Sequence, residues 1–460
     1  MIRLFNHYLP RRVLLQMSLD FGLIVFVVLG IFAAYVRNPE LLLPLAATHG
    51  LSLATGLFVI NTATGFYQPA RKRSMSELLA RVGLSTLFAL PLAYGVFLLM
   101  PVDFSSAKGM ALVAILGFAG INVHRVCAAR AAVRPRTRSR IMILGSGPAA
   151  ELVCETLTNA DPHADVIGFV PSPNETASTV PASKILPVHG SLAATALAAD
   201  VNEIVVALTE RRGGSMPMRD LLDCKIRGIR VFDIATHFEK TLGQIRVDFV
   251  NAGWLIFGDG FNQGLARTAI KRAFDVVSAG LLLLVSAPLM LLTAIAIRLE
   301  SPGPILFRQQ RVGLNGATFD VVKFRSMRVD AEGDGKPRWA TKKDDRVTRI
   351  GKIIRLLRID ELPQLFNVFK GEMSIVGPRP ERPYFVEELT RRIPYYAVRH
   401  SVKPGVTGWA QVRYHYGSSV EDAQQKLHYD LYYVKNHSLF LDLLILFETV
   451  VVVLTGRGAH

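Results

Sequence analysis

Cysteine is scarce in this chain: Cys127, Cys154 and Cys224 are the three among 460 residues, and they form no CxxC pair. Their scarcity and wide spacing argue against a disulfide framework or a zinc cluster and indicate a reducing environment. Acidic residues are also outnumbered, 37 against 53 Lys and Arg, for a formal net charge of +16. This charge favours anionic partners, such as a phospholipid surface, nucleic acid or a phosphorylated substrate. Disorder is excluded, because half of the residues are hydrophobic and the mean hydropathy is +0.30.

Long apolar runs fill the first quarter of the chain, over residues 13–36, 41–66, 82–100 and 110–127. Each approaches or exceeds the ~20 residues that a helix needs to cross the hydrocarbon core, so we predict a four-helix transmembrane bundle over residues 1–128. Lys and Arg gather before the first run, between the second and third, and after the fourth. The positive-inside rule therefore places both ends of the bundle in the cytoplasm. Asp20 interrupts the first run and no cleavage site follows it, so we expect no cleaved signal peptide and place Asp20 near a headgroup boundary.

A basic linker over residues 129–139 leads into an α/β segment, residues 140–262. Short apolar runs at 141–144, 166–170, 204–208 and 229–232 alternate with helical stretches, which predicts a Rossmann-like cytosolic domain with a parallel sheet. The turn Gly145-Ser146-Gly147 is similar to a dinucleotide fingerprint, but Pro171-Ser172-Pro173 stands where an acidic residue is expected, and Pro148 removes one N–H. We therefore favour a structural or regulatory domain over catalytic dinucleotide binding. The run 254–258 is expected as a strand or a cap at the far edge of the sheet.

A fifth apolar run, residues 273–297, is long enough to cross a membrane, but both of its flanks are basic. Pro288 lies in its middle, where it removes an intrahelical hydrogen bond, and Ser286 could satisfy a freed carbonyl. We predict a re-entrant helix–break–helix over residues 273–298 that enters one leaflet and returns. An ordinary crossing, which would export the C-terminal segment, is the alternative.

In the C-terminal segment, residues 266–460, which we expect to be an α/β catalytic domain, carboxylates and cations occur together in short Gly- and Pro-containing motifs. The adjacent Asp360 and Glu361 suit two different tasks, one as nucleophile or base and the other as ligand of a divalent cation such as Mg²⁺. Arg355 lies about a turn and a half of helix before Asp360. Guanidinium and ammonium groups match phosphate oxygens, and the candidate phosphate-binding residues are Lys323, Arg325, Arg355 and Arg379. A carboxylate pair surrounded by cations indicates phosphoryl transfer. Taken singly, these motifs have ordinary explanations: Arg358 could form a surface pair with Glu361, and Trp409 is expected to pack rather than to stack on a ligand.

Several motifs carry a resemblance to a known family. From Lys271 to the C-terminus the sequence resembles the bacterial sugar transferases, polyprenyl-phosphate hexose-1-phosphate transferases that initiate exopolysaccharide and O-antigen assembly. The resemblance is carried by the strings Gln310-Arg311-Val312-Gly313, Lys323-Phe324-Arg325-Ser326-Met327, Asp360-Glu361-Leu362-Pro363-Gln364-Leu365, Gly377-Pro378-Arg379-Pro380 and Lys403-Pro404-Gly405-Val406-Thr407-Gly408-Trp409. The order of four crossings, a Rossmann-like domain and a catalytic unit also looks like the large members of that family.

The resemblance implies a two-step reaction in which Asp360 attacks the β-phosphate of a UDP-hexose and UMP leaves. Undecaprenyl phosphate then takes the sugar phosphate from the aspartate. The resemblance further implies UDP-glucose or UDP-galactose as the sugar donor, since members of the family commonly use these. The resemblance also implies that Glu361 helps to bind Mg²⁺, that Lys323, Arg355 and Arg379 steady phosphates, and that Pro288 is the family's helix-breaking proline. We expect a multi-pass protein of the bacterial inner membrane, in contact with membrane lipids, with its catalytic domain facing the cytoplasm. A homodimer and no nucleic-acid partner are expected.

Two other functions stay open at this stage. A membrane-bound NAD-dependent sugar-nucleotide epimerase or dehydratase would use the turn at Gly145, although the middle segment lacks the Tyr-x-x-x-Lys pair that such chemistry needs. A non-catalytic scaffold or nucleotide sensor would tolerate the loss of Asp360.

Overall fold

The structure is a computed structural model of the full chain. It describes every residue except 1, 5–6, 10, 37–38, 68–74, 100–103, 132–138, 161–163, 173–174, 176–177, 189, 209–215, 251, 258–259, 262–263, 329–345, 415–416, 418 and 455–460. Most of the predicted basic linker, 129–139, and the basic loop between the second and third apolar runs therefore lie outside the described residues. The chain forms two compact units, and the boundary along the sequence lies between Leu242 and Gly243; of the described residues at the N-terminus, Ile2 groups with the first unit and residues 3, 4 and 7 with the second.

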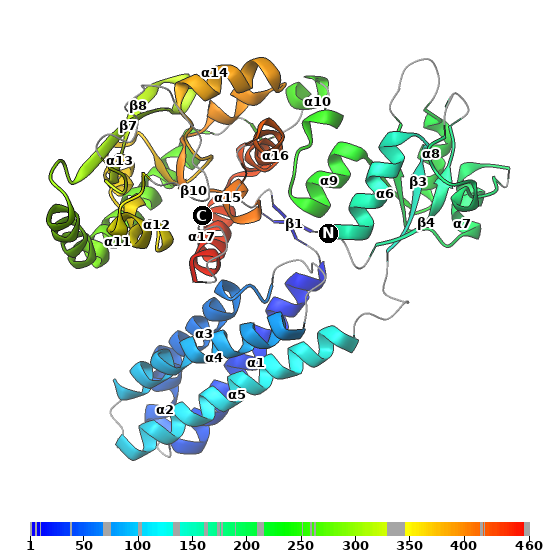
Figure 1. Cartoon of the computed structure of the whole chain (residues 1–460). Helices are drawn as coiled ribbons and strands as arrows, with labels where there is room; N and C mark the ends of the chain where they lie inside the picture. Colours follow the sequence, from blue (N-terminus) through cyan, green and yellow to red (C-terminus); the bar gives the residue numbers. More distant parts are fainter. Residues whose placement is uncertain are drawn as a thin grey trace. The chain divides into compact units, whose positions relative to one another are not determined.

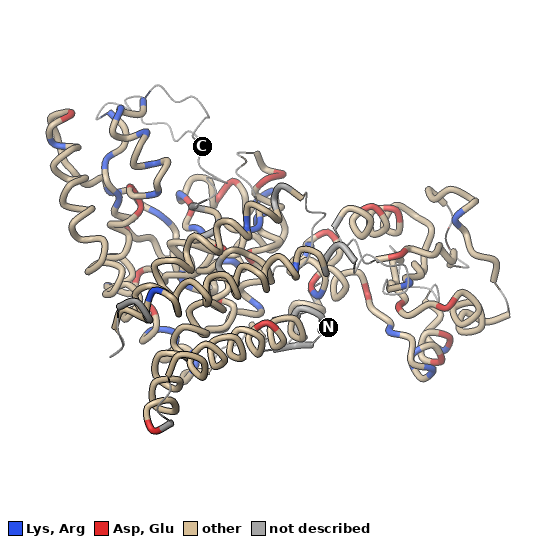
Figure 2. Tube along the Cα trace, turned by 90° about the horizontal axis from the view of Figure 1, so that it is seen from below, with Lys and Arg blue, Asp and Glu red and all other residues tan. Residues whose placement is uncertain are grey.

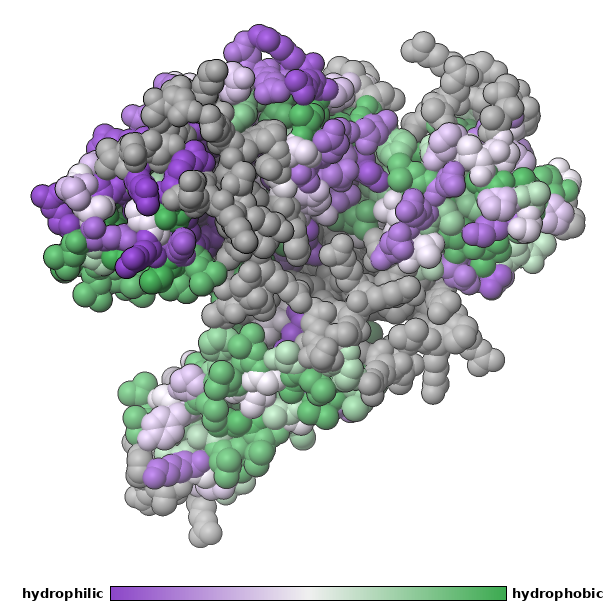
Figure 3. Space-filling model, viewed as in Figure 1, coloured by the Kyte–Doolittle hydropathy of each residue, from purple (hydrophilic) through white to green (hydrophobic). Residues whose placement is uncertain are grey.

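The N-terminal apolar runs form long helices, as predicted (Figure 1). These are α1 (Arg11–Tyr35), α2 (Pro39–Leu45), α3 (Leu51–Ala63), α4 (Met75–Leu98) and α5 (Phe104–Ala131), with a π-helical turn over Ala46–Gly50 between α2 and α3. Aromatic and apolar side chains such as Phe32, Phe97 and Phe118 form the bundle core. The outward faces are apolar too: the helices are mostly green in Figure 3, and few charged residues mark them in Figure 2. Four spans are therefore long and apolar enough to cross a membrane.

One buried ion pair crosses this bundle. Asp20 on α1 binds Arg125 on α5, and both side chains are almost fully buried. The Arg125 guanidinium also lies over the rings of Phe66 and Tyr67, 5.0 and 4.5 Å from their centroids. Asp20 is thus neutralised inside the bundle, since an unpaired carboxylate is costly in that environment.

The middle segment contains a four-stranded parallel sheet in the order β4-β3-β5-β6. Its strands are β3 (Ser139–Leu144), β4 (Ala164–Val170), β5 (Glu203–Val206) and β6 (Arg230–Asp233), which confirms the four predicted runs. The helices are α6 (Pro148–Ala160), α7 (Leu192–Ala198), α8 (Met218–Ile226) and α9 (Ile234–Leu242). Alternate residues of β3 and β5, such as Met142 and Ile204, pack against α7 and α8. Gly145 follows β3 with φ +124°, and a Cβ there would meet the carbonyl of Ala207, so the turn requires glycine.

The second unit is built mainly of helices around two small sheets. β7 (Leu306–Val312) and β8 (Thr318–Phe324) form an antiparallel pair, and β9 (Ser374–Val376) and β10 (Gly405–Thr407) pair in parallel. The helices are α10 (Ala252–Phe257), α11 (Leu265–Glu300), α12 (Arg349–Leu356), α13 (Gln364–Lys370), α14 (Pro383–Arg392), α15 (Trp409–Arg413), α16 (Val420–Asn436) and α17 (Leu439–Leu454). A further short pair, β1 (Ile2–Leu4) and β2 (His7–Leu9), lies at the N-terminus.

The segment around Trp254 differs from the expectation of a sheet-edge strand. It forms α10, and it lies in the unit that begins at Gly243 rather than with the parallel sheet. Contacts within the second unit hold the segment there: Trp409 Nε1 donates to Gly243 O at 2.8 Å, and the Lys435 ammonium lies 3.9 Å from the ring centroid of Trp254. Trp409 is buried, which confirms the prediction that it packs.

The fifth apolar run is one 36-residue helix, α11, that continues through Pro288. Large apolar side chains cover its surface: Leu284 and Val285 are 74% and 78% exposed, which suits contact with lipid. Ser286 Oγ donates to Leu282 O at 2.6 Å, whereas the carbonyl that Pro288 frees, four residues before it, belongs to Leu284. The serine therefore has a different acceptor from the expected one, and no non-helical break separates two helices here.

Candidate active site

The Asp360-Glu361 pair lies on a tight turn between two helices. Thr348 caps α12 by accepting a hydrogen bond from Gly351 N, and the helix ends at Leu356. Arg358 then adopts left-handed backbone angles, φ 59° and ψ 18°, and a 3₁₀ turn over Ile359–Glu361 leads into α13. The spacing of Arg355 and Asp360 suggested that they share one helix. They do not, because α12 ends at Leu356 and Arg358 has left-handed backbone angles. A strained residue directly before a charged turn is typical of functional sites.

Apolar packing fixes the underside of this turn. Ile359, next to Asp360, belongs to a buried cluster with Ile297 of α11, Phe324 of β8 and Ile354 of α12. The long apolar helix, the β7–β8 hairpin and the charged turn are thus joined through one small core. The packing of Ile359 in this cluster therefore also fixes the position of Asp360 along the length of α11.

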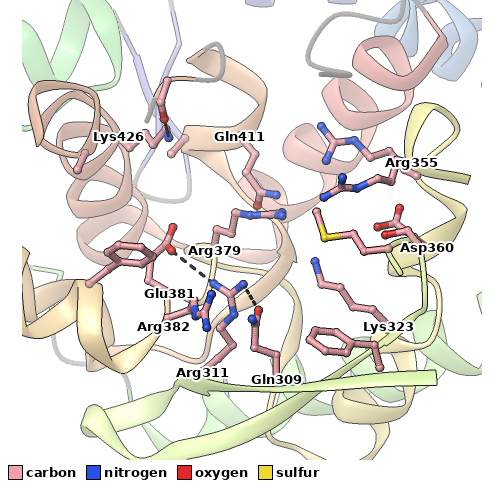
Figure 4. Close-up of a pocket in the computed structure, with 18 of the residues that line it drawn as sticks. Gln309, Arg311, Lys323, Arg355, Asp360, Arg379, Glu381, Arg382, Gln411 and Lys426 are labelled. Atoms are coloured by element: carbon pink, nitrogen blue, oxygen red, sulfur yellow. Dashed lines mark hydrogen bonds and ion pairs between the residues drawn. The ribbon is translucent and has the colours of Figure 1, made fainter. Parts of the chain in front are cut away.

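A cavity of about 420 Å³ opens above the turn. Asp360, Lys323 and Arg355 line one side of it, Arg379 stands between, and a second group of polar side chains lies opposite (Figure 4). That second group comprises Gln309, Arg311, Glu381, Arg382, Gln411 and Lys426. The structure therefore brings together Asp360, Lys323, Arg355 and Arg379 from four separate segments, as the sequence predicted.

Glu361 is held by cations. Its Oε1 accepts from Arg379 Nη2 at 2.9 Å and Lys323 Nζ at 3.2 Å, and Arg358 Nη1 lies 3.9 Å away. Burial opposes ionisation of this carboxyl, but Arg379, Lys323 and Arg358 together hold its pKa well below the usual range. The i,i+3 pair of Arg358 with Glu361 is as expected, and it is one part of this larger cluster.

Asp360 has the opposite environment. It is 8% exposed and makes no hydrogen bond or ion pair with any other described residue. Burial, reinforced by the charge of Glu361, raises the pKa of Asp360, while Lys323, Arg355 and Arg379 oppose the increase. Two neighbouring carboxyls with pKa values shifted in opposite directions suit two different chemical roles.

The remaining predicted cations differ in what they contact. Burial lowers the pKa of Lys323, and the charge of Glu361 opposes that shift. Arg325 also borders the cavity, but its guanidinium donates to Pro302 O at 2.9 Å, Ser301 O at 2.8 Å and Ser301 Oγ at 2.9 Å. These bonds tie the end of β8 to the segment after α11, so Arg325 has a structural task in this geometry.

Several cavity residues were not assigned from the sequence, above all Arg311, Arg399, Lys426 and Asp430. Arg311 belongs to a motif that the resemblance highlights, yet its role depends on contacts with residues about 70 positions away. The others carry no local pattern that separates them from surface charges.

The parallel-sheet domain has its own candidate anion site, at the turn before α6, but one of its own carboxylates occupies it. Glu175 accepts from Ser146 N at 2.7 Å and Gly147 N at 2.9 Å, and also from Ser146 Oγ at 3.1 Å. These N–H groups would cradle a pyrophosphate in a dinucleotide fold. A cofactor would have to displace Glu175 to reach them.

The cation-lined cavity, with a carboxylate that pairs with no described residue and an apolar helix long enough to enter a bilayer, defines a membrane protein suited to phosphoryl transfer. The family model described as bacterial sugar transferase matches residues 266–456, which include every element of this cavity. The chain is 48% identical over 201 residues to the UDP-glucose:undecaprenyl-phosphate glucose-1-phosphate transferase of Caulobacter vibrioides, which covers 43% of this chain and 75% of that protein. It therefore belongs to the bacterial sugar transferase family.

Two further relatives show how far the likeness extends. The UDP-N-acetylgalactosamine-undecaprenyl-phosphate N-acetylgalactosaminephosphotransferase of Aeromonas hydrophila is 45% identical over 242 residues, which are 53% of this chain and 56% of that protein. The matched part thus spans little more than half of that relative. The exopolysaccharide production protein PSS of Rhizobium leguminosarum is 46% identical over 198 residues, 41% of this chain and 98% of that protein. The names of the Caulobacter and Aeromonas relatives state different sugars, glucose and N-acetylgalactosamine.

Proposed function

We propose that this chain transfers a hexose 1-phosphate from a UDP-sugar to undecaprenyl phosphate, as the first membrane step of exopolysaccharide or O-antigen synthesis. The observation that carries the proposal is the contrast between the two adjacent carboxyls. Glu361 is fixed by Arg379 and Lys323, whereas Asp360 pairs with none of the residues that the structure describes and lines the cavity. The names of the relatives supply the substrate class, and the geometry supplies a nucleophile with cations beside it.

Two balanced steps follow. A carboxylate oxygen of Asp360 attacks the β-phosphorus of the UDP-sugar, and the bond from that phosphorus to the bridging oxygen breaks, so UMP leaves with the oxygen. A phosphate oxygen of undecaprenyl phosphate then attacks the same phosphorus, and Asp360 leaves as a carboxylate. Lys323, Arg355 and Arg379 neutralise the phosphate charge in both steps, so a soluble donor and a lipid acceptor use one site in turn.

A magnesium ion fits this donor set. No group of three or more His, Cys, Asp or Glu residues within the described ranges could hold a metal by itself. Mg²⁺, however, commonly takes one or two carboxylates and completes its shell with substrate phosphates, so Asp360 and Glu361 would hold it together with the donor. The ion would add positive charge at the pyrophosphate, and the residues above perform the same neutralisation from the protein side.

The membrane location belongs to the same proposal. Ile297 of α11 packs against Ile359 beside the nucleophile, so the depth of α11 sets the height of Asp360 relative to lipid phosphate. Basic residues at both flanks of the apolar run favour a position of α11 in which both of its ends face the cytoplasmic side of the inner membrane. Because α11 is continuous, this re-entrant position requires the helix to bend, and Pro288 is the residue at which we expect the bend. A cytoplasmic site would meet UDP-sugars directly.

An NAD-dependent epimerase or dehydratase is not favoured, because Glu175 occupies the N–H groups that such a cofactor would use. The decisive test is UMP release by the purified full chain across a panel of UDP-sugars, with and without undecaprenyl phosphate and Mg²⁺. Asp360→Asn should abolish UMP release and the phosphosugar adduct seen by mass spectrometry. Glu387→Gln, an exposed carboxyl on α14, is the matched control and should keep both. Full activity of Asp360→Asn would support a different nucleophile, and no UMP release by the unaltered chain with any UDP-sugar would support a non-catalytic scaffold.

A further inference from the structure

Arg379 reaches Glu361 from a turn whose backbone is held on two sides. The turn Gly377–Pro380 follows β9, and β10 holds its first half: Gly377 N donates to Thr407 O, and Gly405 N donates to Pro378 O, both at 2.9 Å. Within the described residues, no strand hydrogen-bonds to the backbone of its second half, Arg379 and Pro380, although Val312 N of β7 donates to Glu381 O at 2.9 Å directly after the turn. The carbonyls of Arg379 and Pro380 instead accept hydrogen bonds from two other arginines.

Arg399 is the more deeply buried of these two, with 5% of its surface exposed. Its Nη2 donates to Arg379 O at 2.9 Å, its Nη1 donates to Tyr396 OH at 2.8 Å, and its Nε donates to Asp430 Oδ2 at 3.0 Å. Asp430 is 2% exposed and lies on α16, so the guanidinium bridges that helix and the turn. Because these three acceptors lie in different directions, the guanidinium of Arg399 has little freedom to change its orientation.

Arg311 completes the arrangement from β7. Its Nη1 donates to Pro380 O at 3.1 Å and to Glu381 Oε2 at 3.5 Å, and its Nη2 donates to Gln309 Oε1 at 2.6 Å (Figure 4). Of the three arginines around the turn, Arg379 is thus the one whose side chain contacts the Asp360-Glu361 pair. The other two contact its backbone.

We infer that Arg399, anchored by Asp430, is a positioning residue that fixes the backbone of Arg379 so that its guanidinium meets Glu361 and the donor phosphates. This inference rests on the proposed function and adds residues to it. A small displacement of a phosphate-binding cation can cost a large factor in rate, so the effect of Arg399 should pass through Arg379. A direct phosphate ligand would instead act independently of Arg379.

The test is a double-mutant cycle on UMP release under single-turnover conditions, followed for hours so that slow variants remain measurable. Arg399→Lys keeps the charge but cannot reach all three acceptors. In the wild-type background it should lower the rate about 10- to 100-fold, with a much smaller change in the half-saturating UDP-sugar concentration. In the Arg379→Ala background the same change should lower the rate less than about 3-fold, because the group it positions is gone.

Asp430→Asn is the second variant, since it alters no cation and should reproduce the defect of Arg399→Lys. If either variant fails to fold in a thermal melt, Tyr396→Phe removes one acceptor of Arg399 and should give a smaller loss that also vanishes in the Arg379→Ala background. Equal losses in both backgrounds would overturn the inference. If the wild-type chain releases no UMP, or if Asp360→Asn still releases it, the proposed function is contradicted. Failure of the proposed function can therefore be told apart from failure of the inference about Arg399.

Discussion

The ionisation of Asp360 offers the sharpest prediction. As the nucleophile it must be a carboxylate, so adduct formation should fall as the pH drops through its pKa. Burial and the charge of Glu361 both raise that pKa, and the acid limb of the rate should therefore lie above the usual aspartate value of about 3.9. Glu361→Gln removes one negative neighbour and releases Arg379 and Lys323 from it, and both changes stabilise the ionised Asp360.

The size of the shift follows from Coulomb's law. Adjacent charges at an effective dielectric constant of ~20 interact by roughly 1–3 kcal/mol, which corresponds to about one to two pH units. The assay is the pH dependence of single-turnover adduct formation, measured by mass spectrometry because Glu361→Gln should also be slower. The acid limb should move to lower pH in Glu361→Gln and stay in place in Glu381→Gln, whose carboxylate pairs with Arg311. An unmoved limb in Glu361→Gln, or a shift to higher pH, would refute the coupling of the two carboxyls.

Two further predictions concern stability. Lys271 binds Asp275 at 2.9 Å and Asp442 at 2.8 Å, and both carboxylates are almost fully buried, so Lys271→Met should lower the free energy of unfolding by about 3–5 kcal/mol and lower the melting temperature. Lys225→Met, at an exposed position, is the control and should leave the melting temperature unchanged. An unchanged melting temperature of Lys271→Met would show that the two ion pairs do not stabilise the fold. Arg325→Lys keeps the charge but loses the bonds to main-chain acceptors, so stability should fall by roughly 2 kcal/mol with little change in the half-saturating UDP-sugar concentration; the reverse pattern would make Arg325 a phosphate ligand.

Much of the architecture was readable from local patterns. The membrane helices follow from run length alone, because about 20 apolar residues suffice to cross a bilayer whatever surrounds them. The four strands of the parallel sheet likewise stand in the chain as short apolar runs between helical stretches. The prediction for the segment around Trp254 was wrong, since an apolar run of this length fits a strand or a helix; in the folded chain it forms α10, with Trp254 against Lys435 of α16.

The candidate active site, like the fold, could be predicted from the sequence only in part. The sequence by itself determined which residue types would meet, an adjacent carboxylate pair and a set of cations in short motifs. Only the tertiary structure decided their surroundings, because Glu361 is held by Lys323, 38 residues before it, and Arg379, 18 residues after it, while Asp360 pairs with no other residue in the described part of the chain. Arg325 and Arg399 are chemically identical to Arg379, yet both direct donors at main-chain carbonyls. A guanidinium binds whichever acceptors lie around it, and those acceptors come from distant segments that only the folded chain brings together.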